Sequence, residues 1–375
     1  MHSFDDEQNR VLVNLNAYYE QWVAAARELD GPYKGSMRWK VVAGKQYLYH
    51  RVTAVPLVEM SLGRRASATE TRMVAFQQGK AAATARCGRA LAEVSRFARV
   101  LRALGLGLVP SPAARLLRHF DRKAMLGPLL LVVGTISMSA YEVEAGARIF
   151  RGFDATQDFD LAWRGIDALQ LQSTAPVSLL GSLREVDPLF TKNTERGFQA
   201  VSGKYQVEIL AAPSTLGSFP RDDLVPIAGM VEQEWLLLGR PVRHVISASD
   251  GTPAPLVAPD PRWMALHKLW LSHKPGRAAA KRPKDQAQGL LLLRAVIEAM
   301  PGYPVDDAFL AMVPPELRGF LRAGVDWASA NRSLQAAGEG GDAFTRGAAA
   351  KLAPGVLRKV RRTAPVALAF PANYA

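Results

Sequence analysis

The sequence of 375 residues contains only one cysteine, Cys87. A single cysteine excludes a disulfide framework and every zinc site that needs several thiolates. Cys87 stands among alanines in a helical pattern, so we expect it to be a small core residue rather than a nucleophile. The six histidines are scattered and show no metal-ligand spacing. The sequence therefore lacks the marks of a zinc protein and of a disulfide-stabilised scaffold.

Long apolar segments are missing as well. The longest one, Met125 to Tyr141, is interrupted by Gly127, Pro128 and Gly134. It falls short of the roughly 20 apolar residues that a membrane-spanning helix needs. The first six residues are polar and acidic, unlike a signal peptide or a transit peptide. We therefore expect a cytoplasmic protein without a membrane partner.

Acidic residues are outnumbered by basic ones, and the net charge is +13. Between Lys34 and Lys123 the sequence contains 18 basic and 4 acidic residues, an excess of 14 that is as large as the net charge of the whole chain. Such asymmetry favours a polyanionic partner, with RNA or DNA foremost. A solvated surface on an arginine-rich protein would give the same charge, so both interpretations remain open.

Three regions differ in their residue patterns, and the length suits two or three domains. Residues 1–123 are basic and mainly helical, residues 124–260 mix strands with helices, and residues 261–375 are helical again. Ser3 followed by Asp6 resembles a capping box and predicts the start of the first helix. A second helix is predicted from about Thr69 to Leu104, with an apolar stripe that includes Leu91, Val94, Ala98 and Leu101.

The middle region carries the strand signals. Residues 129–133 are continuously apolar, which predicts a strand buried on both faces, and helical composition follows from Thr135 to Ala145. Residues 156–163 alternate between apolar and polar, as in a strand. Residues 198–202 and 205–210 predict a hairpin around Gly203. The fold class is therefore predicted as α+β, with a small mixed-sheet core flanked by N-terminal and C-terminal helical regions.

Two aspartates in the alternating strand suggest a chemistry. Asp158 and Asp160 are two residues apart, so they share one face, while Phe159 and Leu161 anchor the other face. Carboxylates are the hard ligands that Mg²⁺ prefers, and a pair of metals aligns phosphoryl and nucleotidyl transfer. Glu208 is the best candidate for a third ligand, because it is an acid in an otherwise apolar strand. Alone, an Asp-x-Asp pair is common by chance.

The turn before that strand suits phosphate. Gly134 lets the backbone approach an anion, and the following helix start offers N–H groups and a positive dipole. Thr135 and Ser137 can add hydroxyl contacts. Any strand-to-helix turn can use glycine, so the signal gains its weight from the aspartate pair that follows.

Together these motifs resemble the nucleotidyltransferase fold of the DNA polymerase beta superfamily, in the segments Val133-Gly134-Thr135 and Asp158-Phe159-Asp160-Leu161. The chain is most similar to a bacterial family of this fold with a helical N-terminal region. The further matches are Tyr47-Leu48-Tyr49, Ser61-Leu62-Gly63, Tyr141-Glu142 and Thr156 at the start of the aspartate motif. The resemblance implies Mg²⁺ or Mn²⁺ at Asp158, Asp160 and Glu208, and an NTP such as ATP held by Gly134, Thr135, Ser137 and Thr156.

The C-terminal part is similar to the nucleotidyltransferase toxins of abortive-infection systems. The matching segments are His267-Lys268-Leu269 and Lys284-Asp285-Gln286. By this likeness Lys268 would contact the nucleotide phosphates, Lys284 and Asp285 would line the same cleft, and an antitoxin partner is conceivable. The plain alternative for Lys268 is a solvated lysine beside a packed helix face.

The predicted function is metal-dependent transfer of an NMP from an NTP to an acceptor hydroxyl, with RNA as the first candidate and a tRNA end as one form of it. One alternative is a non-catalytic nucleic-acid-binding or regulatory protein on a decayed transferase fold. Another is transfer to a protein or a small molecule. The chain departs from the superfamily in its long gap between Thr135 and Asp158, which suggests an extra strand or loop around residues 147–155, and in having glutamate as the third acid.

Overall fold

The computed structural model describes residues 1–53, 57–106, 108–150, 158–165, 178–193, 199–203, 205–219, 224 and 230–336, without the side chains of Asp158 and of residues 331–336. The chain forms two compact units. The first unit comprises residues 1–4, 127–244 and 256 onward, and the second comprises residues 5–126 and 245–255. Thr156 and residues 337–375 of the predicted C-terminal helical region lie outside the described residues. The three sequence regions stay a prediction about domain organisation.

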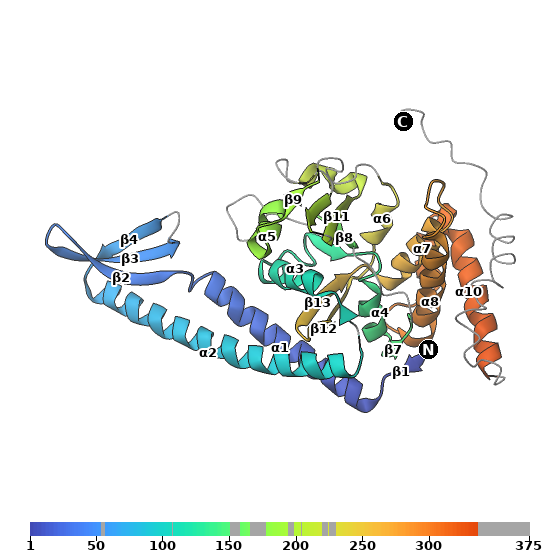
Figure 1. The fold of residues 1–375 in the computed structure, drawn as a ribbon, viewed down its shortest axis with the longest axis horizontal. Helices are drawn as coiled ribbons and strands as arrows, with labels where there is room; N and C mark the ends of the chain where they lie inside the picture. Colours follow the sequence, from blue (N-terminus) through green and yellow to red (C-terminus); the bar gives the residue numbers. More distant parts are fainter. Residues whose placement is uncertain are drawn as a thin grey trace. The chain divides into compact units, whose positions relative to one another are not determined.

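The second unit is built on two long helices that pack along each other, with a strand sheet at one end of them (Figure 1). Its elements are α1 (Asp6–Asp30), β2 (Ser36–Val42), β3 (Lys45–Thr53), β4 (Val58–Arg64), α2 (Ser67–Ala103), β5 (Leu108–Val109) and α3 (Ser111–Arg122). The strands β2, β3 and β4 pair antiparallel in chain order. Short connections between neighbouring strands favour this meander.

The first helix begins two residues later than expected. Asp5 is its N-cap and forms a reciprocal capping box with Gln8, at 2.7 Å and 3.0 Å. Ser3 belongs instead to the short strand β1, so the predicted Ser3 capping box is wrong. The buried stripe of α1 includes Val11, Leu15 and Tyr19, which recur at three- and four-residue steps.

The long helix α2 matches its predicted extent to within two residues at its N-terminal end. Val94 and Leu101 are buried, and Phe97 stacks on Tyr18 of α1 with ring centroids 5.6 Å apart. Leu91, in contrast, is 43% exposed and does not belong to the packed stripe. Cys87 is only half buried, so the expectation of a core cysteine is also wrong.

The first unit contains a mixed sheet with helices around it. Its elements are β1 (His2–Ser3), β6 (Leu130–Val132), α4 (Met138–Glu144), β7 (Ala147–Arg148), β8 (Asp158–Trp163), α5 (Leu179–Val186), β9 (Thr191–Lys192), β10 (Gln199–Ser202), β11 (Tyr205–Ala211), the 3₁₀ helix η1 (Pro213–Ser218), α6 (Gln233–Leu236), α7 (Pro261–Leu271), α8 (Arg282–Ala299), α9 (Asp307–Met312) and α10 (Pro315–Ala336). The strands β12 (Val242–Ala248) and β13 (Pro253–Ala258) cross the boundary between the units. Within the second unit, β12 pairs in parallel with β5.

The sheet of the first unit has the described strand order β6-β8-β11-β10-β9. The strands β8 and β11 are parallel, whereas the other neighbours are antiparallel. The residues of β6 are buried on both faces, and Phe159 and Leu161 of β8 are fully buried. The predicted α+β class with a small mixed sheet between helical regions is thereby confirmed.

The strand β7 lies in the long gap that the sequence shows after Thr135. It pairs antiparallel with β1, with His2 opposite Arg148. The expected extra strand is therefore present at Ala147–Arg148, and residues 151–157 are outside the described part of the chain.

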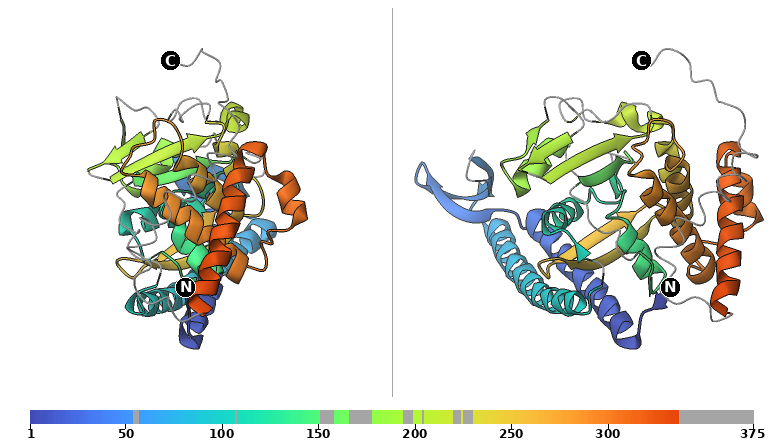
Figure 2. Two further views of the ribbon diagram at one scale, coloured as in Figure 1. Left: turned by 90° about the vertical axis from the view of Figure 1, so that its right-hand side faces the viewer. Right: turned by 45° about the vertical axis from the view of Figure 1, so that its right-hand side comes forward.

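The helices α7, α8 and α10 lie side by side in the first unit (Figure 2). Glycine permits the close approach of α7 and α8, because a Cβ at Gly289 would meet Leu269 Cγ at 2.7 Å. None of the described helices is long and apolar enough to cross a bilayer.

Candidate active site

Two of the predicted acids are neighbours across a parallel strand pair. Asp160 of β8 lies directly opposite Glu208 of β11, and both side chains are half buried. Neighbouring strands are about 4.8 Å apart, and register-matched residues of parallel strands point to the same face. The two carboxylates therefore share one face of the sheet. Two carboxylates side by side repel each other when both are charged.

The third component of the candidate site is Gly134, in the turn that follows β6. Val133 donates its N–H to the Asp160 carbonyl at 3.1 Å, which fixes the turn beside the acid. Gly134 has a φ of +71°, and a Cβ there would lie within 3.0 Å of Asp160 Oδ2 and 3.2 Å from its Cγ. Only glycine permits both this backbone conformation and this approach. The sequence motif Gly134-Thr135 thus lies against the carboxylate of Asp160.

The turn after Gly134 is more compact than the sequence suggests. Ser137 is buried and donates its hydroxyl to the Gly134 carbonyl at 2.8 Å. Thr135 is half buried, and the helix α4 begins only at Met138 and has seven residues. The helix expected from Thr135 therefore starts three residues later, and residues 134–137 form turns. Ser137 stabilises this turn, while its proposed contact with nucleotide stays a prediction.

Glu208 has a neighbour that the sequence argument overlooked. Gln199 of β10 lies opposite Glu208, is 1% exposed and donates its side-chain amide to Glu208 Oε1. The amide orients one oxygen of the carboxylate without adding charge. Glu208 is therefore a positioned acid, and its burial is partly compensated by this hydrogen bond.

The charge of Asp160 also affects a nearby phenol. Burial, and secondarily the negative charge of Asp160, raise the pKa of Tyr205. Tyr205 stacks on Phe159 on the opposite face of the strands, with centroids 6.5 Å apart. Tyr205 therefore stays neutral and acts as an apolar support under the acids.

The remaining acid of the predicted trio is only partly described. The backbone of Asp158 belongs to β8 and lies opposite Gln206, whereas its side chain and the whole of Thr156 are outside the described structure. Among the side chains that are described, no group of three histidine, cysteine, aspartate or glutamate residues surrounds a metal position. The role of Asp158 as a metal ligand stays a prediction.

The Tyr-Glu motif serves to brace the fold around the site. Tyr141 is fully buried and donates its hydroxyl to the Pro259 carbonyl at 3.0 Å. Glu142 accepts hydrogen bonds from the backbone of Ile149 and Phe150, at 2.7 Å and 2.9 Å. Glu142 thus holds the segment that follows β7, whereas Tyr141 ties α4 to the connection between β13 and α7.

A second group of predicted residues meets between α7 and α8. Lys268 donates to Asp285 Oδ1 at 3.0 Å, and Arg277 lies 2.6 Å from Asp285 Oδ2. The Lys268 and Asp285 side chains are 6% and 3% exposed. One carboxylate thus balances two cations, which leaves one positive charge in a poorly solvated place. Lys284 begins α8 nearby and is half buried.

The pKa of His267, the residue before Lys268, is lowered by burial and by the nearby positive charges. His267 is buried, and neither ring nitrogen has a hydrogen-bond partner among the described residues. Burial, and then the charges of Lys268, Arg277 and Lys274, lower the pKa of His267 to about 3. His267 is therefore neutral at physiological pH, consistent with the packing role that its position between tryptophan-bearing turns suggests.

The comparison with protein families gives the class of the chain. Residues 111–314 match the sequence profile of a family described as nucleotidyltransferase. The chain belongs to this nucleotidyltransferase family. Curated proteins and solved structures gave no significant match. Membership makes the protein a transferase-type enzyme whose general reaction is nucleotidyl transfer, and an NTP is its implied substrate.

The matched segment of this nucleotidyltransferase contains both groups. In the sheet group, Gly134 lies against Asp160, which lies opposite Glu208. In the helical group, Lys268 pairs with Asp285. These contacts lie within each group. Sequence reasoning missed Arg277 and Gln199. The predicted hairpin already implied a cross-strand partner for Glu208, whereas Arg277 lies in a stretch that the sequence suggested to be an exposed loop or helix start.

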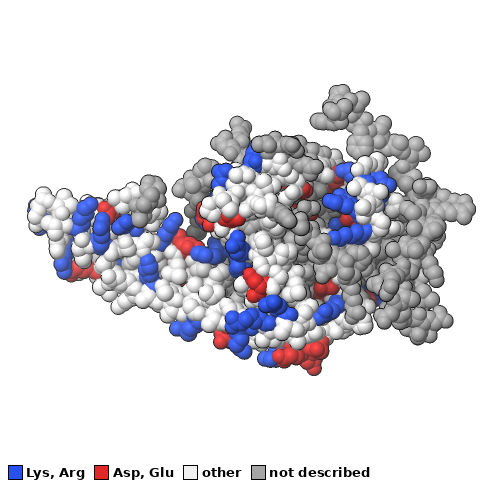
Figure 3. All heavy atoms as spheres, viewed as in Figure 1, with Lys and Arg blue, Asp and Glu red and all other residues white. Residues whose placement is uncertain are grey.

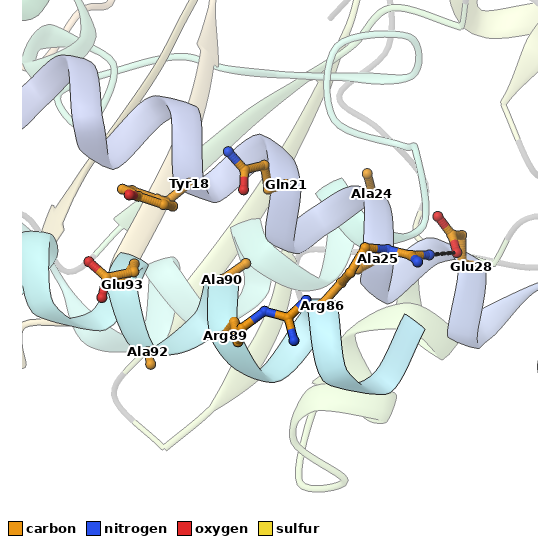
Figure 4. Close-up of a pocket in the computed structure, with 10 residues that line it drawn as sticks. All are labelled: Tyr18, Gln21, Ala24, Ala25, Glu28, Arg86, Arg89, Ala90, Ala92 and Glu93. Carbon is orange, nitrogen blue, oxygen red and sulfur yellow. Dashed lines mark hydrogen bonds and ion pairs between the residues drawn. The ribbon is translucent and has the colours of Figure 1, made fainter. Parts of the chain in front are cut away.

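Pockets of the second unit involve other residues. One of about 730 Å³ opens between α1 and α2. Figure 4 shows Arg86 reaching Glu28 across it, with Arg89, Tyr18 and Glu93 on its walls. Its charged groups are of both signs and partly paired, so it lacks the concentrated charge expected of a nucleotide site.

Proposed function

We propose that this nucleotidyltransferase moves an NMP from an NTP to an acceptor hydroxyl with release of pyrophosphate, and that the acceptor is RNA. The observation that carries the proposal is the register match of Asp160 with Glu208 beside Gly134. Two half-buried carboxylates lie on one sheet face next to Gly134, whose lack of a Cβ exposes the backbone. This arrangement suits a site for cations and phosphate.

The residues fit a divalent metal, Mg²⁺ or Mn²⁺. Asp160 and Glu208 supply hard oxygen donors side by side, and Gln199 leaves part of the Glu208 carboxylate available. Asp158 is the proposed further ligand. Bound divalent ions supply charge neutralisation along the triphosphate and acidify the acceptor hydroxyl.

The chain's own residues then have distinct tasks. The acceptor oxygen attacks the α-phosphorus, the bond from that phosphorus to the bridging oxygen breaks, and pyrophosphate leaves. Glu208 accepts the proton of the acceptor hydroxyl. Gly134, Thr135, Ser137 and Thr156 are proposed to hold the nucleotide along the turn and strand.

The helical group is proposed to neutralise the phosphates. Lys268 uses one of its three N–H donors on Asp285, so two remain for an anion. Asp285 fixes the position of Lys268, and Lys284 is proposed to line the same cleft. The surplus positive charge of the Lys268, Asp285 and Arg277 group supports a role toward phosphate.

RNA is proposed as the acceptor because of the charge of residues 34–123, where basic residues exceed acidic ones by 14. Polyanions bind such regions through release of counterions. A toxin-like role and an antitoxin partner stay predictions from the resemblance.

The test is transfer of label from each α-³²P-labelled NTP to total RNA, with Mg²⁺ or Mn²⁺. We expect labelling by the full chain and a decrease of about 100-fold or more in Asp160→Asn and in Glu208→Gln, because each substitution removes a negative charge of the proposed site and loss of one such electrostatic group costs about that much. The matched control is Asp307→Asn, which removes an exposed carboxylate in the same unit. Equal labelling by all variants, or by none, would refute the proposal. If mass spectrometry finds the label on a protein or a small metabolite instead, RNA is not the acceptor.

A further inference from the structure

One face of the sheet β2–β3–β4 combines aromatic rings with basic side chains. On the central strand β3 the alternate residues of this face are Lys45, Tyr47, Tyr49 and Arg51. Both tyrosines are half buried, so part of each ring is accessible. Residues two apart on a strand are about 6.8 Å apart. The face, here named the tyrosine face, thus presents two neighbouring rings between two cations.

The neighbouring strands extend the same pattern. Tyr47 lies opposite Lys40 of β2 and Arg64 of β4, and Tyr49 lies opposite Arg38 of β2. The Lys40 ammonium is 4.9 Å from the centroid of the Tyr49 ring. Arg38, Lys40 and Arg64 therefore complete the tyrosine face around the rings.

The other face of the sheet is the packed one. Leu48 is fully buried there, and the ring of His50 lies 5.5 Å from the ring of Phe76 on α2. Since side chains alternate along β3, the tyrosine face points away from this contact. The packing contacts that the structure describes for this sheet thus lie on the face opposite the tyrosine face.

Charge on this sheet is strongly unbalanced. Five basic residues and one acid, Glu59, occur between Ser36 and Arg64. Glu59 forms ion pairs with Arg38 at 2.6 Å and with Lys40 at 3.2 Å. Lys45, Arg51 and Arg64 have no carboxylate partner among the described residues, and Figure 3 shows basic side chains gathered over this end of the second unit.

We propose that the tyrosine face binds single-stranded RNA, with bases stacked on Tyr47 and Tyr49 and phosphates held by Lys45, Arg51 and Arg64. Bases of a single strand are free to stack on aromatic rings, whereas those of a duplex are not. The same positive charge opposes pairing of this face with a second copy of the chain. The choice of RNA rests on the proposed function, but binding itself does not require transfer.

The experiment measures binding of a fluorescent 12-nucleotide single-stranded RNA to the full chain carrying Asp160→Asn, by anisotropy at several salt concentrations. We expect Tyr47→Leu and Tyr49→Leu each to weaken binding about tenfold at an unchanged salt slope, because stacking is lost and charge is kept. Tyr47→Phe and Tyr49→Phe keep the ring and should bind like the parent. Equal melting temperatures of the leucine and phenylalanine variants would show that loss of the fold does not cause the weaker binding.

Charge is tested separately. Arg51→Gln and Arg64→Gln should each reduce the slope of log affinity against log salt by about 0.7, as expected for one lost phosphate contact to a single strand. The matched control is Arg96→Gln, an exposed arginine of α2 that pairs with Glu93. It lies 20 residues beyond Phe76, roughly 30 Å along the helix, and should leave binding unchanged.

Several outcomes would overturn the tyrosine face as an RNA site. Parent-like binding by the leucine variants, binding of duplex RNA or heparin as tightly as single-stranded RNA, or tighter binding of single-stranded DNA would each do so. Loss of binding in the phenylalanine variants would also do so. If the unsubstituted chain transfers no nucleotide while RNA binding still depends on both tyrosines, the proposed function is refuted and this inference stands.

Discussion

Replacing Gly134 by alanine tests whether the turn after β6 positions the acid. A Cβ at this residue would meet three side-chain atoms of Asp160, with Oδ2 within 3.0 Å, Cγ at 3.2 Å and Cβ at 3.4 Å. The contact to Cβ is ordinary packing, but rotation about the Cβ–Cγ bond moves only Oδ2, so relief of the contact to Cγ needs rotation about the Cα–Cβ bond or a shift of the backbone. We therefore expect the whole side chain of Asp160 to shift from its place beside Glu208.

The backbone contributes a second cost. Alanine at the φ of +71° found at Gly134 costs about 1–2 kcal/mol of stability. Gly146 is a matched control, because its φ is +57° and no described atom lies within 4 Å of a Cβ built there. Both Gly134→Ala and Gly146→Ala should therefore lose similar backbone stability, and only Gly134→Ala should displace Asp160.

The assay compares unfolding by urea with labelling of RNA from the preferred NTP. We expect Gly146→Ala to keep near-parental kcat below its melting temperature, and Gly134→Ala to lose about 100-fold, since a displacement near 1 Å of a reacting group costs that much. If both variants lose the same stability and keep the same kcat, the approach of Gly134 to Asp160 has no part in the reaction.

Two further predictions concern the helical group. Asp285→Leu should destabilise the protein by about 3–5 kcal/mol in urea unfolding, because it leaves the buried Lys268 and the neighbouring Arg277 without their shared carboxylate. The double variant Lys268→Met with Asp285→Leu should recover much of this loss, and an additive double variant would contradict the ion pair. His267 has a folded pKa of about 3, below its ordinary 6.5, so the unfolded chain binds the proton more readily. Stability should thus fall as pH decreases below about 6.5, by up to roughly 1.4 kcal/mol per unit. His267→Gln should flatten this dependence and His2→Gln, at an exposed site, should not, whereas an unchanged slope in His267→Gln would show that His267 is not responsible.

The strands of the site were predictable because their signals are local. The apolar run of β6 and the alternation around Phe159 and Leu161 depend only on neighbouring residues, and the structure has strands at both places. The hairpin of β10 and β11 was predictable from its two apolar segments and the glycine between them. Burial patterns of this kind follow from the two-residue period of a strand.

The exact ends and partners were less predictable. Ser3 and Asp5 both have N-cap chemistry, and the pairing of β1 with β7 decides in favour of Asp5. Leu91 fits a helical stripe by spacing, yet the buried face of α2 at this level runs through Ala90 and Val94, so Leu91 remains exposed. These differences arise because a distant segment selects among options that are locally equivalent.

By itself, the sequence determined that Asp158 and Asp160 occupy one strand, that a glycine turn precedes them and that basic charge concentrates before residue 124. The tertiary structure alone decided that Glu208 lies opposite Asp160, that Gly134 lies against the same carboxylate, and that Arg277 joins Lys268 and Asp285. Register between strands and contact between helices depend on packing of residues far apart in the chain, and a one-residue slip would have moved Glu208 to the other face.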